Sequence, residues 1–154
     1  MPTPDPLTHV RANPDLYLPG GRAEPSDFAT RLAGDALTLG ATRTLAVRHG
    51  DWWAVAADID WLAAGPVAVT ELFARIVPFP QSGPNAMRSE VLLGAYADHV
   101  VTWSGPISTL VKGSAGDLHP LRTSFDDPSW RRVIAFRIEA ARLPKARAVS
   151  TTTA

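Results

Sequence analysis

The sequence contains no cysteine, no excess of charge of either sign and no long apolar run. The absence of cysteine excludes disulfides, thiolate metal sites and thiol nucleophiles. Basic and acidic residues number 15 each, and this balance argues against a broad binding surface for nucleic acid. No segment approaches the roughly 20 apolar residues of a membrane-spanning helix, and the N-terminus lacks the apolar core of a secretion signal. We therefore expect a soluble cytoplasmic protein without a membrane partner.

The residues that are present suit one globular domain. The chain has 154 residues, of which 45% are hydrophobic, enough for one core and too few for two domains. We place this single domain at 1–141. Residues 142–154 are basic and rich in Ser and Thr, and we expect them to form a disordered tail. The abundance of Ala and Arg, with little Lys, is typical of a bacterial source of high GC content.

The hydrophobic periodicity predicts the order of helices and strands. Helices are expected at 26–39, 70–76 and from 84 or 85 to 97, with a short helix or extended arm at 7–12. Strands are expected at 42–48, 52–58, 98–103, 107–112 and 131–140. Ser26 is the expected N-cap of the first long helix, and Gly40 is expected to end it. The three prolines within 77–84 make that segment irregular, and Gly94 inside a helix indicates a close backbone contact.

This order predicts an α+β fold. The simplest way to bury the apolar stripes is a two-layer α/β sandwich, with a mixed, mostly antiparallel sheet and helices packed on one face. In the second strand, Trp52 and Trp53 are adjacent, so we expect them to lie on opposite faces of the sheet.

The N-terminal segment carries a resemblance to a known family. Residues 9–18 read H-V-R-A-N-P-D-L-Y-L, similar to the V-R-x-R-P-x-M-Y-I-G segment of gyrase B. The order of arm, helix, β-hairpin, loop, helix and antiparallel strands is also similar. Over 7–138 the chain resembles the GHKL ATPase domains, the group of gyrase B and the histidine kinases. This resemblance implies a GHKL (Bergerat) fold and leaves ATP as the one cofactor to consider.

In that family the first long helix carries the catalytic residues. Residues 35–41, D-A-L-T-L-G-A, resemble the family's helix ending, D-E-A-L-x-x-x-A. Counted back without a gap, Asp27 stands where the family has the Glu that activates water, and it is our candidate catalytic residue. Arg31 stands where the family has a magnesium-ligating Asn, but a guanidinium has only donors and cannot ligate a metal. Arg31 is a candidate phosphate contact, with a solvated helix residue as the alternative.

The family's second motif, D-x-G-x-G, corresponds to residues 58–62. Asp58 stands at the Asp that accepts from the adenine amino group, while Asp60 and Leu62 replace the two glycines. Asp58 and Asp60 lie two residues apart, so on a strand they would share a face and could form a ligand site. A polar strand end is the alternative.

The family's third motif is a glycine-rich lid that leads into a helix N-terminus where phosphates bind. Here the corresponding segment is 83–90, and Gly83 is the one glycine of the motif that remains. Asn85 and Arg88 still offer donors at the approach to the helix, so we predict an anion-binding role for them. No metal site is expected, because the four histidines lack the spacing of metal ligands.

Three functions remain open. The first is a gyrase-B-like ATPase fold that has lost catalysis and works as a binding or protein-interaction module, holding a small ligand, a protein partner or a second copy through the arm at 7–18. The second is a divergent ATP-binding protein or weak ATPase. The third is a DNA-associated factor using basic C-terminal residues, namely Arg131, Arg132, Arg137, Arg142, Lys145 and Arg147. Without the magnesium ligand and the lid, ATP hydrolysis is not expected.

Overall fold

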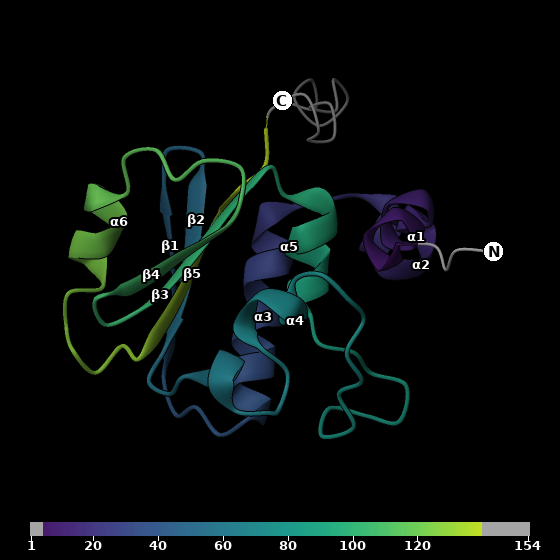
Figure 1. Ribbon diagram of the computed structural model, residues 1–154, viewed down its shortest axis with the longest axis horizontal. Coiled ribbons are helices and arrows are strands. Elements are labelled where there is room, and N and C mark those ends of the chain that lie inside the picture. The colour runs from purple at the N-terminus through teal and green to yellow at the C-terminus, as the bar shows by residue number, and fades with distance from the viewer. Residues whose placement is uncertain (1–4, 140–154) are drawn as a thin grey trace, which may run out of the picture.

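The computed structural model describes residues 5–139, which fold around a five-stranded antiparallel sheet (Figure 1). The order of strands across the sheet is β1 (Thr44–His49), β2 (Trp52–Ala57), β5 (Arg132–Arg137), β3 (His99–Ser104) and β4 (Ile107–Lys112). The last strand in sequence therefore lies in the middle, paired with β2 on one side and with β3 on the other. The predicted tail at 142–154 lies outside the described residues.

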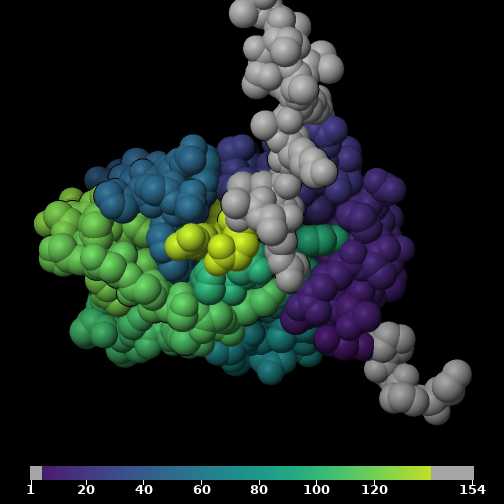
Figure 2. All heavy atoms as spheres, turned by 90° about the horizontal axis from the view of Figure 1, so that it is seen from above, coloured from purple at the N-terminus to yellow at the C-terminus, as the bar shows by residue number. Residues whose placement is uncertain are grey.

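The helices lie in unequal layers on the two sides of this sheet (Figure 1). On one side are α3 (Pro25–Thr38), α4 (Val69–Leu72), α5 (Glu90–Tyr96), the arm helices α1 (Pro6–Ala12) and α2 (Pro14–Tyr17), and the 3-10 turns at Pro19–Gly21 and Trp61–Ala63. On the other side is α6 (His119–Ser124) alone. The predicted α+β sandwich with an antiparallel sheet is confirmed, and α6 is an addition that the sequence did not predict. Figure 2 shows the arm and the α6 side at opposite ends of the molecule.

The alternation along the strands explains why both faces are covered. In β5, Ile134 and Phe136 enter the core beneath α3 and α5, while Val133 and Ala135 enter the core beneath α6. Trp52 is buried on the α6 face, and its neighbour Trp53 packs against the opposite core, as predicted. Because successive side chains alternate, one strand supplies both cores.

The start of α3 differs from the prediction, whereas its end does not. Glu24 is the N-cap residue, without a side-chain hydrogen bond, and Pro25 begins the helix, so Ser26 is not the cap. Proline suits the first helical position because it has no backbone N–H to leave unpaired. At the other end Gly40 has a φ of +113°, a value that glycine adopts without strain.

The predicted start of α5 was wrong by several residues. The helix begins at Glu90 and not at Pro84 or Asn85. The preceding segment folds back on itself, since the Phe79 N–H donates to the Ala86 carbonyl (2.9 Å) and the Arg88 N–H donates to the Val77 carbonyl (2.8 Å). These cross-loop bonds use backbone groups that a helix would need, and so they delay its start.

The N-terminal arm packs against α5 of its own domain. Arg11 donates from Nε to the Ala95 carbonyl (2.9 Å), and the Tyr96 hydroxyl donates to the carbonyl of Val10, which is itself buried. A Cβ at Gly94 would overlap the Phe73 carbonyl, which confirms the predicted close backbone contact. A homodimer through the arm stays a prediction. Within residues 5–139 no helix has the length and apolarity needed to cross a membrane.

Candidate functional site

The two candidate residues on α3 bind each other. Arg31 Nε lies 3.0 Å from Asp27 Oδ2, one helical turn away, and both side chains are about one-third exposed. The pair is a helix-surface ion pair of the kind formed at i,i+4 spacing. The carboxylate proposed to activate water is therefore occupied by the guanidinium at the magnesium-ligand position.

The Asp58 side chain links the end of β2 to the residues just before β1. Its carboxylate accepts from the Thr42 backbone N–H (3.0 Å) and from the Thr42 hydroxyl. These hydrogen bonds, the hydroxyl foremost, lower the pKa of Asp58 below its ordinary value. Since β2 ends at Ala57, Asp58 is not part of the strand.

Asp60 has a separate partner. Arg132 donates to it in a bidentate pair, from Nε to Oδ1 (2.8 Å) and from Nη2 to Oδ2 (2.9 Å). Arg132 is almost fully buried, and its Nη1 also contacts the Thr102 hydroxyl (3.4 Å). Asp58 and Asp60 thus hold different segments and do not form the predicted carboxylate pair. Arg132 is one of the basic residues considered for DNA contact, and its guanidinium is already paired with Asp60.

Arg88 is buried and not presented to an incoming anion. Its Nη2 lies 2.8 Å from Glu90 Oε1, its Nε lies 3.9 Å from Asp35 Oδ2, and Nη2 also contacts the Trp61 carbonyl at 3.3 Å. Asn85 is in an exposed turn next to Gly83. The structure therefore separates Arg88 from Asn85 and does not gather the predicted phosphate-binding donors.

A pair of buried acids completes this cluster, and the sequence analysis missed it. The Asp35 carboxylate accepts from the Ser89 backbone N–H (2.7 Å), and Glu90 has no exposed surface. Burial raises the pKa of Glu90 to about 8, with the nearby Asp35 adding to the effect and Arg88 opposing it. Burial also raises the pKa of Asp35. When Glu90 is protonated, the negative charge of Asp35 is balanced by the positive charge of Arg88.

The space beside this cluster is small. A cavity of about 160 Å³ lies between the Trp61–Ala63 turn, α4 and the folded-back 77–88 segment. Ligand pockets commonly enclose about 300–1,000 Å³. Of the predicted site residues only Arg88 lines this cavity, whose other lining residues are mainly Leu, Val, Pro and Phe. Trp61 is fully buried in the adjoining core. A nucleotide has no room in this cavity.

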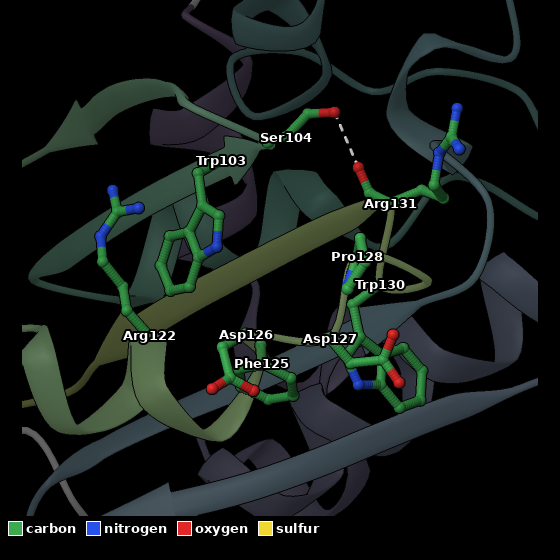
Figure 3. A pocket seen from close by; sticks show the side chains of 10 residues that line it. Trp103, Ser104, Arg122, Phe125, Asp126, Asp127, Pro128, Trp130 and Arg131 are labelled. Atoms are coloured by element: carbon green, nitrogen blue, oxygen red, sulfur yellow. Dashed lines mark hydrogen bonds between the residues drawn. The ribbon is translucent and has the colours of Figure 1, made fainter.

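A larger pocket lies on the opposite side of the sheet, under α6 (Figure 3). It encloses about 510 Å³ between α6, the β3–β4 turn and the loop that leads into β5. The residues that line it are Trp103, Ser104, Gly105, Arg122, Phe125, Asp126, Asp127, Pro128, Trp130 and Arg131. All of them come from the β3–β4 hairpin or from the continuous segment 122–131.

Aromatic rings form the walls of this pocket, which we call the α6 pocket. Phe125 and Trp130 meet edge to face, with ring centroids 6.3 Å apart. Two guanidinium groups back the indoles, with Arg122 4.5 Å from the Trp103 ring and Arg43 4.7 Å from the Trp130 ring. Cation–π contacts of this kind hold a ring in one orientation. The walls are therefore formed before any ligand arrives.

The comparisons with known proteins give no relative for this chain: no family model, curated protein or solved structure matches it. Among residues 5–139 no group of three or more His, Asp or Glu side chains is placed to hold a metal ion.

Proposed function

We propose that this protein is a binding module on a degenerate gyrase-B-like ATPase fold, and that it does not hydrolyse ATP. The observation that carries the proposal is the ion pair between Asp27 and Arg31. A positive group at the magnesium position repels the cation that ATP needs, and it also engages the carboxylate that would activate water.

The other residues of the expected ATP site support the same proposal. Asp58 is held by Thr42, Asp60 by Arg132 and Arg88 by Glu90. A binding site needs groups that a ligand can still reach, and these side chains are engaged within the fold. The α6 pocket has open volume and unengaged donors, so it is the binding site of the proposed module.

Calorimetry with a non-hydrolysable ATP analogue, with and without magnesium, tests this proposal, together with an assay of phosphate release from ATP. We expect no magnesium-dependent binding and no release above the protein-free rate. Arg31→Asn, which restores the amide used in the family, is the matched variant. Micromolar binding that requires magnesium in the wild-type protein would contradict the proposal.

A further inference from the structure

We propose that the α6 pocket binds a planar aromatic ring that carries a carboxylate or a phosphate group. This inference rests on the proposed function, since it names the ligand class of the same module. It follows from three features of the pocket, namely its walls, its donors and the state of its acceptors.

The walls select a flat, apolar body. Trp130 is half-buried and offers most of the exposed ring surface, whereas Trp103 and Phe125 are almost fully buried and add little to it. Aromatic surfaces stack on or meet the edges of other rings with a preference that aliphatic ligands do not match. A volume of about 510 Å³ suits a ring system with one substituent.

The pocket offers hydrogen-bond donors that nothing in the fold uses. The indole nitrogens of Trp103 and Trp130 both turn toward the space between the two rings (Figure 3). Neither indole N–H has an acceptor among residues 5–139, and both are outside the set of buried unpaired atoms, so solvent or a ligand reaches them. An indole N–H can only donate, and therefore it requires an acceptor on the ligand.

The cations of the pocket add to this donor set. The Arg122 guanidinium stacks on Trp103 and has no carboxylate within ion-pair distance among the described residues. The Arg131 side chain extends away from the two indoles (Figure 3), and it likewise has no partner in the part of the chain that the structure describes, so it adds positive charge at the edge of the pocket. Stacking uses the face of a guanidinium and leaves its N–H edge free to bind a carboxylate or phosphate in bidentate fashion.

The acceptors of the pocket are engaged or turned away. Asp127 accepts from the Ser129 backbone N–H (2.8 Å), and this bond is the main cause of its lowered pKa. Asp126 turns its carboxylate away from Trp130 (Figure 3). The Ser104 hydroxyl donates to the Arg131 carbonyl (2.7 Å). Both aspartates keep their negative charge, so the preference for a ligand that brings negative charge depends on the donors that outnumber them, two indole N–H groups and two guanidinium groups.

The test compares probes that share a ring and differ in charge, using calorimetry on the full chain. Indole-3-acetate is matched against tryptamine, and adenosine monophosphate is matched against adenosine, all without magnesium. We expect at least one anion to bind about tenfold or more tightly than its matched partner, as hydrogen bonds to a charged group imply. A preference for the acetate assigns a carboxylate ligand, and a preference for the monophosphate assigns a phosphate ligand.

Two substitutions link the preference to this pocket. Arg122→Gln and Arg131→Gln each remove one charge and should reduce the anion preference by about fivefold or more, with little change for adenosine, the uncharged probe. Arg48→Gln is the matched control, since Arg48 also lies over an indole, that of Trp53, at 5.7 Å but outside the pocket. The inference is overturned if neither anion binds more tightly than its matched partner, if no probe binds, or if both pocket variants keep the full preference. None of these results bears on ATP turnover, so the proposed function is judged separately.

Discussion

The two faces of the sheet treat their polar groups in opposite ways. On the α3–α5 face buried arginines are paired with carboxylates that lie far away in the sequence, as in Arg88 with Asp35 and Arg132 with Asp60. On the α6 face, around a pocket of about 510 Å³, two arginines have no ion pair and two indole N–H groups have no acceptor among residues 5–139. Polar residues that stabilise the fold and polar residues that meet a ligand are thus separated by the sheet.

This contrast corrects the interpretation drawn from the family resemblance. The resemblance directed attention to the α3–α5 face, where the family binds ATP. On that face the charged side chains pair with one another inside the protein. Removing one partner of a buried ion pair is costly because the other charge is left without compensation. Substitutions on the α3–α5 face test this contrast.

Arg88→Met should have the largest effect on stability. It leaves Asp35 and Glu90 buried without their cation, and we expect a loss of about 3–5 kcal/mol in the free energy of unfolding. Urea denaturation measures the loss. Arg75→Met is the control, since Arg75 and Glu71 form an exposed helix pair that should matter by less than about 0.5 kcal/mol. Equal losses in the free energy of unfolding for the two variants would contradict the distinction between buried and surface ion pairs.

Gly94→Ala should have the second-largest effect on stability. The added methyl overlaps the Phe73 carbonyl and presses on Leu7, so α5 must shift, at a cost of about 3 kcal/mol. Gly34→Ala in α3 is the matched control, because its Cβ meets nothing within 4 Å and alanine favours a helix by about 0.5–1 kcal/mol. Thermal melts should therefore move in opposite directions, and a stable Gly94→Ala protein would contradict the close packing of α5.

Glu90→Gln should change how stability depends on pH. The pKa of Glu90 is raised from its ordinary 4.5 to about 8 in the folded protein, so the folded state holds more protons than the unfolded state between these values. The contribution of Glu90 to stability should therefore be full below about pH 4.5 and fall as pH rises toward 8. Chemical denaturation at a series of pH values should show a flatter profile for Glu90→Gln than for the wild type. The exposed Glu71→Gln should keep the wild-type slope, and a flattening there too would point to a different titrating group.

Asp27→Ala should have the smallest effect. The pair with Arg31 is partly exposed at i,i+4 spacing, so we expect a loss of about 0.3–0.5 kcal/mol and no change in binding at the α6 pocket. Denaturation and titration with the pocket probes measure the two quantities. A loss of binding without loss of stability would move the binding site to the α3–α5 face.

The sequence predicted those parts of the fold that depend on local pattern. The alternation of Val133, Ile134, Ala135 and Phe136 gave β5 with its two faces, and Gly94 within an apolar helix indicated the close contact that is present. The start of α5 was wrong because Met87 continues the helical spacing of Val91 and Ala95, while the backbone before Glu90 pairs across a loop. The short helix α6 went unpredicted, since six residues containing a proline provide no clear period.

The candidate site was predictable in composition but not in geometry. The family motifs predicted polar residues at the site, and each of them has a hydrogen-bond or ion-pair partner within the protein. These residues are Asp27, Arg31, Asp58, Asp60 and Arg88. Asp27 and Arg31 pair locally at i,i+4 spacing, but the other partners lie up to 72 positions away along the chain, and no local pattern identifies those. Trp103 and Trp130 were visible as aromatic residues, but nothing in their spacing showed that α6 brings them together.

The sequence by itself determined the class of fold, the strand faces and the position of the tight helix contact. These follow from the period of two in a strand, the period of 3.6 in a helix and the special geometry of glycine, all of which act over a few residues. Only the tertiary structure decided which charges are paired and which remain free. Burial and partner choice depend on chain segments that meet after folding, and this meeting separates the closed α3–α5 face from the open α6 pocket.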